Sequence, residues 1–121
     1  MSLTVLAIDD SSTMRNLISM TLSSAGFDVV LAEDGIDGLE KLETCSPNLV
    51  ITDINMPRLD GFGVIEQVRA NPRHRDLPIL TLTTESAAEM KQRARNAGAT
   101  GWIVKPFDPV KLVNVIHRVA R

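Results

Sequence analysis

The chain has too few cysteines, too little net charge and too short apolar runs for several broad classes of protein. Its single cysteine, Cys45, excludes an internal disulfide and fits a reducing compartment. A net charge of −2 leaves no basic excess of the kind that general nucleic-acid binders carry. No apolar run approaches the roughly 20 residues of a membrane span, and no signal-peptide pattern opens the chain. We therefore expect a cytoplasmic protein that binds neither membrane nor nucleic acid.

What is present is the composition of one globular domain. The 121 residues are 44% apolar and 23% charged, which is ordinary for a compact domain of this length. No internal repeat, linker or low-complexity tail interrupts them. We expect a single domain over residues 1–121, with no second domain, and a monomer.

Short apolar runs alternate with segments of helical spacing. The runs at 4–8, 28–32, 49–52, 79–82 and 101–104 are rich in Val, Ile and Leu, which predicts strands buried on both faces of a parallel sheet. Apolar residues recur at helical spacing within 14–22, 37–44, 64–68, 110–120 and, more weakly, 86–97. Gly26 and Gly98 are suited to ending helices, and Asp108 followed by Pro109 is suited to starting one.

Five strands alternating with five helices predict an α/β fold, a doubly wound parallel sheet with helices on both faces. In such sheets, ligands bind beyond the carboxyl ends of the strands, where the strand order reverses. Polar side chains follow four of the predicted strands: Asp9 and Asp10, Asp53, Thr83 and Thr84, and Lys105. All of them are therefore expected at one edge of the sheet.

Three carboxylates at one small surface need a counter-charge. Carboxylates a few ångströms apart repel one another and raise one another's pKa, and a divalent metal offsets that repulsion. Mg²⁺ prefers oxygen ligands and usually binds one or two carboxylates together with a phosphate. We expect Asp10 and Asp53 to ligate Mg²⁺ directly and Asp9 to act through a water molecule. The turn after Asp53 allows the backbone carbonyl of Asn55 to supply a further oxygen.

The lysine indicates phosphate chemistry. A carboxylate can accept a phosphoryl group as an acyl phosphate, and phosphoryl transfer needs mainly positioning and charge neutralisation. Lys105 is expected to neutralise one phosphoryl oxygen, and Thr83 to donate a hydrogen bond to another. The cluster is thus predicted to hold Mg²⁺ and to carry or bind phosphate.

Six segments carry a resemblance to a known family. They read IDDSSTMR (8–15), AEDGIDGL (32–39), TDINMPRLDG (52–61), LTTE (82–85), AGA (97–99) and VKPF (104–107). In this order, and at strand ends, they make the chain similar over essentially its whole length to response-regulator receiver domains. It is most similar to the single-domain chemotaxis regulators of the CheY type. The resemblance implies a flavodoxin-like sheet of order 2-1-3-4-5 and no output domain.

The resemblance also implies roles for the cluster. Asp53 would accept a phosphoryl group from the phosphohistidine of a sensor kinase. The Mg²⁺ would be organised by Asp9, Asp10, Asp53 and the carbonyl of Asn55. Thr83 matches the family's switch threonine and Lys105 its phosphate-facing lysine. The bond from Lys105 to Pro106 is expected to be cis, a minority form that would aim the lysine inward.

Further positions concern switching and the lifetime of the signal. Trp102 stands where the family commonly has Tyr or Phe, and its indole N–H needs a partner when it is buried. Phosphorylation is expected to draw Thr83 toward the phosphoryl group and to let Trp102 enter the space that it leaves. Asn55 and Glu85 lie where the family tunes hydrolysis of its own acyl phosphate. We therefore expect a phosphoacceptor signalling protein and not an enzyme.

The implied partners are a sensor histidine kinase of the chemotaxis type, a flagellar motor switch protein and a phosphatase. A phosphate sink or relay intermediate, or the receiver fragment of a larger regulator, stays open as an alternative. Other classes fit less well. A flavodoxin-like cofactor binder would need a phosphate loop where Asp9 and Asp10 stand, and an aspartyl phosphatase would need a second Asp where Ser11 and Ser12 follow. No Gly-Lys-Ser/Thr nucleotide loop exists.

The remaining polar residues are expected to have no special chemistry. Arg69, Arg73 and Arg75 are predicted to form a solvated basic loop. His74 and His117 have no partners at metal-ligand spacing, which predicts surface residues.

Overall fold

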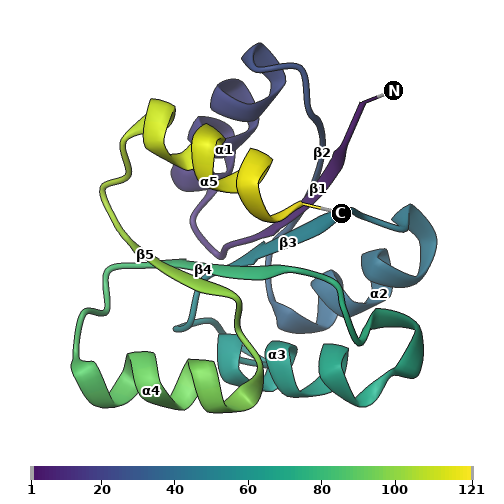
Figure 1. Cartoon of the computed structure of the whole chain (residues 1–121), viewed down its shortest axis with the longest axis vertical. Coiled ribbons are helices and arrows are strands. Elements are labelled where there is room, and N and C mark those ends of the chain that lie inside the picture. Colours follow the sequence, from purple (N-terminus) through teal and green to yellow (C-terminus); the bar gives the residue numbers. More distant parts are fainter. Residues whose placement is uncertain (1, 121) are drawn as a thin grey trace.

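Five strands alternate with five helices over residues 2–120, the part of the chain that the computed structural model describes (Figure 1). In chain order the elements are β1 (Thr4–Ile8), α1 (Ser12–Ser24), β2 (Asp28–Ala32), α2 (Gly35–Cys45), β3 (Leu49–Thr52), α3 (Gly61–Ala70), the 3₁₀ turn η1 (Pro72–His74), β4 (Ile79–Thr83), α4 (Ala88–Ala97), β5 (Gly101–Val104) and α5 (Pro109–Val119).

The strands form one parallel sheet in the order β2-β1-β3-β4-β5. Its register places Ile8, at the end of β1, between Ala32 of β2 and Thr52 of β3. The carboxyl ends of these strands therefore lie together at one edge. The predicted α/β fold and its strand order are confirmed. β4 runs one residue beyond the prediction, because Thr83 still pairs with Val104 of β5.

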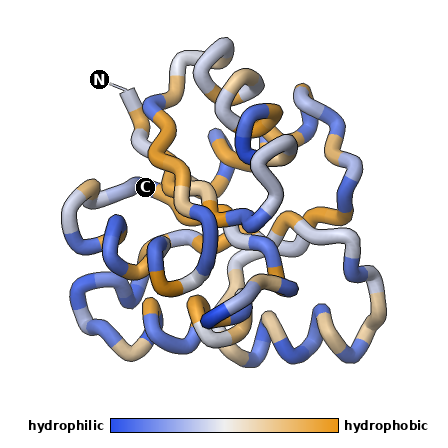
Figure 2. Tube along the Cα trace, turned by 180° about the vertical axis from the view of Figure 1, so that it is seen from behind, coloured by the Kyte–Doolittle hydropathy of each residue, from blue (hydrophilic) through white to orange (hydrophobic). Residues whose placement is uncertain are grey.

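Helices cover both faces of the sheet, with α1 and α5 on one face and α2, α3 and α4 on the other (Figure 1). Successive residues of a strand point to opposite faces, so the sheet supplies two cores. The core beneath α2, α3 and α4 includes Leu6, Ile8, Leu42, Phe62 and Ala94. The core beneath α1 and α5 includes Val5, Ala7, Ile18, Leu22 and Leu112. Figure 2 shows the hydrophobic residues concentrated along the central strands and the hydrophilic ones on the outer turns.

Side-chain caps fix the starts of four of the five α-helices. The capping oxygens belong to Ser11, Asp34, Asp60 and Asp108, and each accepts a backbone N–H of its helix. By contrast, α4 follows Ala87, which supplies no side-chain cap. It begins at Ala88 rather than near residue 86, because Ala87 keeps extended backbone angles. Within residues 2–120, none of the helices combines the length and the hydrophobicity that crossing a bilayer requires.

The prediction of a solvated basic loop is wrong for Arg69. Its guanidinium is half-buried and donates to the carbonyls of Gly98 (3.0 Å), His74 (3.0 Å) and Leu77 (2.6 Å). Burial lowers the pKa of this guanidinium. Arg69 thus ties the end of α3 both to the α4–β5 turn, at Gly98, and to the segment between η1 and β4, at His74 and Leu77.

The other members of that group divide between surface and interior. Arg73 is exposed and pairs with Glu43 at 3.4 Å. His74 is partly buried, so the prediction of a surface residue is wrong for it. His117 is exposed, as predicted, and its ring lies against that of Phe27, with centroids 5.0 Å apart.

Candidate functional site

Backbone hydrogen bonds at the carboxyl edge of the sheet set the positions of the predicted site residues. The N–H of Asp9 donates to the carbonyl of Ala32, and that of Asp53 to the carbonyl of Ile8, both at 3.0 Å. The N–H of Lys105 donates to the carbonyl of Thr83 at 2.8 Å. Each residue therefore continues the ladder of its strand by one step, which fixes its place relative to the neighbouring strands.

The three predicted aspartates come together as expected. Carboxylate oxygens of Asp9, Asp10 and Asp53 all lie within 4.8 Å of one another. Asp9 is 1% exposed and Asp53 is 8% exposed, whereas Asp10 is open to solvent. The cluster thus has two buried acids and one at its mouth.

Lys105 crosses the cluster and joins its two buried acids. Its Nζ lies 2.8 Å from Oδ2 of Asp9 and 2.9 Å from Oδ2 of Asp53. Burial alone lowers the pKa of this ammonium, but its hydrogen bonds to Asp9 and Asp53 outweigh that effect, so the pKa lies above the usual value for lysine. Lys105 therefore stays charged. Its bond to Pro106 is cis, as expected.

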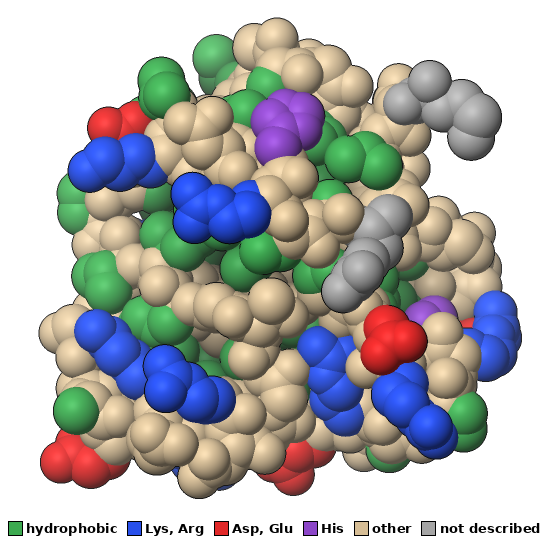
Figure 3. All heavy atoms as spheres, viewed as in Figure 1, with side chains coloured by type: hydrophobic (Ala, Val, Ile, Leu, Met, Phe, Trp, Pro, Cys, Tyr) green, Lys and Arg blue, Asp and Glu red, His purple; other side chains and the backbone are tan. Residues whose placement is uncertain are grey.

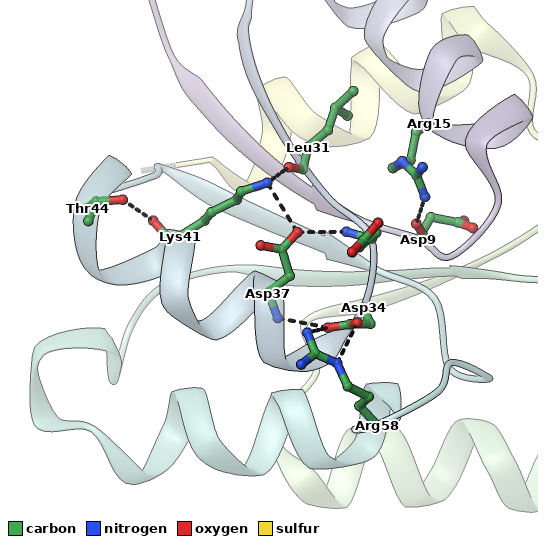
Figure 4. Close-up of polar contacts among 9 residues, drawn as sticks. Asp9, Arg15, Leu31, Asp34, Asp37, Lys41, Thr44 and Arg58 are labelled. Atoms are coloured by element: carbon green, nitrogen blue, oxygen red, sulfur yellow. Dashed lines mark hydrogen bonds and ion pairs between the residues drawn. The ribbon is translucent and has the colours of Figure 1, made fainter.

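The other oxygens of the buried acids are held by nearby backbone. Oδ1 of Asp53 accepts the N–H of Ile54 at 2.6 Å. Oδ1 of Asp9 accepts the N–H of Ser11 at 2.9 Å. Arg15 donates to the backbone carbonyl of Asp9 at 2.7 Å, as Figure 4 shows. Among residues 2–120, Asp10 makes no hydrogen bond or ion pair, so its carboxylate is free to bind a ligand.

The donor set fits Mg²⁺. Three carboxylates against one ammonium leave an excess of negative charge, and all the donors are hard oxygens. Two oxygens on one Mg²⁺ can be no more than about 4.2 Å apart, twice the Mg–O distance, so the observed cluster needs only small movements to close on an ion. Asn55 is exposed in the β3–α3 loop, two residues after Asp53. The role of its carbonyl as a ligand stays a prediction.

Thr83 and Trp102 are connected through the backbone of one residue, Glu85, which the sequence did not predict. Thr83 is fully buried, and its Oγ1 accepts the N–H of Glu85 at 3.2 Å. The indole N–H of Trp102 donates to the carbonyl of Glu85 at 3.0 Å. Trp102 is half-buried against the core beneath α2, α3 and α4. Its indole thus has the partner that burial requires, and the backbone at Glu85 joins the two predicted switch residues.

A second charged pair beside the cluster was missed. Arg58 binds both oxygens of Asp34, with Nε at 2.8 Å and Nη2 at 2.9 Å. The two residues are 24 positions apart in the chain, and they meet because β2 and β3 flank β1 in the sheet. The only sequence signal was the suitability of Asp34 as a helix cap, which does not identify a partner.

Comparisons with known proteins agree with this geometry. The family model for the response regulator receiver domain matches residues 5–117. The chemotaxis protein CheY1 of Helicobacter pylori J99 is 43% identical over 107 residues, which cover 87% of this chain and 86% of that protein.

Two solved structures are also similar. Chemotaxis protein CheY4 of Vibrio cholerae superposes with a TM-score of 0.94 at 42% identity, covering 98% of this chain and 99% of that one. The receiver domain of sensor histidine kinase PA1611 from Pseudomonas aeruginosa PAO1 superposes with a TM-score of 0.90 at 26% identity, covering 98% of each chain. That structure is described with a magnesium ion coordinated in its active-site cleft.

The family model spans nearly all of the described fold, whose strand order β2-β1-β3-β4-β5 is the one that the resemblance implied. The acidic edge of the sheet therefore belongs to a receiver domain of a two-component response regulator, and this chain is a CheY-like member of the response regulator receiver domain family.

Proposed function

We propose that this protein is a Mg²⁺-dependent phosphoacceptor that takes a phosphoryl group from a sensor histidine kinase onto Asp53. The observation that carries the proposal is the bridge from Lys105 to Asp9 and Asp53, at 2.8 and 2.9 Å. Desolvating a largely buried lysine costs free energy unless the lysine is paired with acids, as Lys105 is here. Here it holds the acceptor carboxylate in place and stands ready for an incoming phosphoryl oxygen.

The transfer exchanges one bond to phosphorus for another. A carboxylate oxygen of Asp53 forms the new O–P bond, the N–P bond of the phosphohistidine breaks, and the histidine nitrogen keeps the electron pair. Bound Mg²⁺, held by Asp10, Asp53 and the carbonyl of Asn55, with Asp9 acting through water, would neutralise phosphoryl oxygens. Lys105 moves from the Asp53 carboxylate to a phosphoryl oxygen and keeps its hydrogen bond to Asp9.

Loss of the phosphoryl group reverses the switch. Water attacks phosphorus in line and the bond from phosphorus to the Asp53 oxygen breaks. The Asp53 carboxylate is restored, and inorganic phosphate is released. Asn55 is exposed and Glu85 half-exposed, so both side chains can reach an incoming water or a phosphatase. The protein is thus a phosphoacceptor with self-limiting chemistry rather than an enzyme acting on other substrates.

Output passes through the backbone of Glu85, whose N–H and carbonyl contact the two switch residues. Thr83 would move toward a phosphoryl oxygen in order to donate to it, and this movement would break the hydrogen bond that Thr83 accepts from the N–H of Glu85. The β4–α4 loop then moves, and with it the carbonyl that holds Trp102. The phosphoryl contacts bias two pre-existing arrangements of this loop.

The face that would read this change surrounds β5, the edge strand. Figure 3 shows Lys and Arg side chains over α4 and α5, with hydrophobic side chains between them. The exposed basic residues are Lys91 and Arg95 of α4 and Lys111 and Arg118 of α5. Such a face fits a partner segment that carries acidic residues beside an apolar stretch. A flagellar motor switch protein is the proposed target, in cytoplasmic control of chemotaxis.

The phosphoacceptor proposal is tested by intact-mass measurement after incubation with acetyl phosphate. The expected result is one added phosphoryl group on the wild type with Mg²⁺, none after chelation, and none on Asp53→Asn. A stable wild type that gains no mass and binds no beryllium fluoride, a phosphoryl mimic, would contradict the proposal.

A phosphate sink or relay intermediate is the second candidate. It is favoured by the similarity to a receiver domain that belongs to a sensor kinase. Pull-down with the motor-binding peptide, with and without phosphorylation, separates the two. Capture that depends on phosphorylation supports the motor role, and capture only by a kinase or phosphotransfer domain supports the relay.

A further inference from the structure

The loop that follows Asp53 is fastened to the start of α2 by a paired set of hydrogen bonds. Arg58 lies in this β3–α3 loop, and its Nε and Nη2 donate to the two oxygens of Asp34 at 2.8 and 2.9 Å (Figure 4). Asp34 is 6% exposed and also caps α2 through the N–H of Asp37. A two-pronged guanidinium–carboxylate pair fixes direction as well as distance. We call the Asp34–Arg58 pair the latch.

The backbone at Arg58 shows that the loop is held in an unusual shape. Arg58 has a φ of +67°, a left-handed conformation that residues other than glycine rarely adopt. Such a conformation persists when the surrounding structure determines it. Here the latch supplies that constraint, because Arg58 reaches Asp34 from this conformation.

Close packing leaves the loop little room beside the latch. A Cβ on Gly35, the first residue of α2, would collide with the carbonyl oxygen of Leu59. Within the loop, the N–H of Gly61 donates to the carbonyl of Ile54, and that of Leu59 to the carbonyl of Pro57, both at 2.8 Å. Residues 54–61 therefore form a closed unit seated on α2.

We propose that Arg58 is a positioning residue for the metal: through the latch it holds the loop so that the carbonyl of Asn55 faces the ion, and it thereby sets the affinity for Mg²⁺. This inference rests on the proposed function, in which Asn55 supplies a ligand. Arg58 itself does not touch the ion. Without the latch, only a fraction of loop conformations would present the carbonyl, and the apparent affinity would fall by that fraction.

The binding of Mg²⁺ to the unphosphorylated protein tests the proposal, measured by isothermal titration calorimetry. Arg58→Ala is expected to weaken Mg²⁺ roughly tenfold, the lower end of what the loss of an indirect partner of a metal site costs. Asp34→Asn keeps a capping oxygen for α2 and should weaken binding similarly. The double variant should be no weaker than either single one, because both changes break the same latch.

Two further variants separate the latch from general stability. Arg58→Gly removes the guanidinium but suits the left-handed backbone, and it should bind Mg²⁺ as weakly as Arg58→Ala. Arg73→Ala breaks another pair that ties α2 to a neighbouring element, Arg73–Glu43 at 3.4 Å. That pair lies outside the β3–α3 loop, so Arg73→Ala should leave the affinity for Mg²⁺ unchanged.

Several results would contradict the proposed role of the latch in Mg²⁺ binding. Equal Mg²⁺ affinity in wild type and Arg58→Ala, with only a lower unfolding temperature, would reduce Arg58 to a structural role. If Arg58→Gly bound Mg²⁺ as tightly as the wild type, the weaker binding of Arg58→Ala would be assigned to backbone strain and not to loss of the latch. Absence of Mg²⁺ binding in the wild type itself would overturn the proposed function together with this inference, which distinguishes the two failures.

Discussion

The two loops that border the acidic cluster are held in opposite ways. The β3–α3 loop is closed by the hydrogen bond from Gly61 to Ile54 and fastened to α2 by Arg58 and Asp34. The β4–α4 loop is held by two hydrogen bonds at the backbone of Glu85, and it leads into a helix with no side-chain cap. The first loop keeps the metal side of the site constant, while the second can shift when a phosphoryl group arrives.

The helices that follow these two loops, α3 and α4, also differ in how firmly they are held. Five residues of α3 are buried, whereas Ala94 is the one buried residue of α4. One further contact holds α4: the guanidinium of the exposed Arg93 lies 3.9 Å from the ring centre of the buried Phe62. Elements with few buried apolar contacts open at lower free energy. We therefore expect α4 to be the mobile part of the output face.

The largest expected effect comes from forcing the rigid loop open. In Gly61→Ala the new Cβ would collide with the carbonyl oxygen of Asp53 and lie 2.8 Å from Cα of Ile54. Overpacking at rigid backbone costs about 3 kcal/mol, measured as the free energy of unfolding in urea. Gly26→Ala is the control, because its Cβ meets nothing within 4 Å and only the φ of +92° opposes it, at about 1 kcal/mol. Equal losses of unfolding free energy in Gly61→Ala and Gly26→Ala would show that the β3–α3 loop adjusts to the added Cβ and is not rigid.

A smaller effect is expected from cutting the tie of the weakly held loop. Trp102→Phe removes the donor to the carbonyl of Glu85 and should cost about 1 kcal/mol. Thr83→Val removes the acceptor for the N–H of Glu85. Because both bonds hold the backbone of the same residue, Glu85, a double-mutant cycle by urea unfolding should show coupling between them. Strict additivity would contradict the proposed connection between the two switch residues.

Adding a side-chain cap to α4 should stabilise the more weakly held of the two loops and the helix that follows it. Ala87→Ser places a hydroxyl at the cap of α4, and it should stabilise the folded state by up to about 1 kcal/mol. By holding the start of α4, it should also reduce the spectral change that beryllium fluoride causes in Trp102 fluorescence. Asp60→Ala, which removes an existing cap from α3, should destabilise by a similar amount without that reduction. An unchanged fluorescence response in Ala87→Ser would show that α4 does not take part in the switch.

The smallest effect concerns pH and distinguishes the loops by their chemistry. Hydrogen bonds from Arg58 lower the pKa of Asp34. The ionised form therefore stabilises the fold above the unfolded pKa of about 4, and this contribution is lost as pH falls through the folded value. The stability difference between wild type and Asp34→Asn should thus shrink below about pH 4, followed by urea unfolding from pH 3 to 7. The stability difference between wild type and Trp102→Phe should stay constant over this pH range. If it declined in parallel with the difference for Asp34→Asn, the pH dependence could not be assigned to the Asp34–Arg58 pair.

Most of the fold and half of the site could be predicted from the sequence. Strand runs such as 101–104 and the cap at Asp108 are local signals, and the carboxyl edge then gathers Asp9, Asp53 and Lys105. The latch and the three carbonyls bound by Arg69 were missed, because they join segments far apart in the chain through the exact approach of backbones. An arginine in a polar segment gives no sign of which carbonyl or carboxylate it will meet.

Hydrogen–deuterium exchange by mass spectrometry tests the contrast between the loops most directly. It would follow residues 54–60 and 84–97 in Mg²⁺, before and after addition of beryllium fluoride. Faster initial exchange in 84–97, and a change there that residues 54–60 do not share, is the result that we predict. Slow and unchanged exchange in 84–97, or an equal response of residues 54–60, would contradict a fixed metal side and a movable output side.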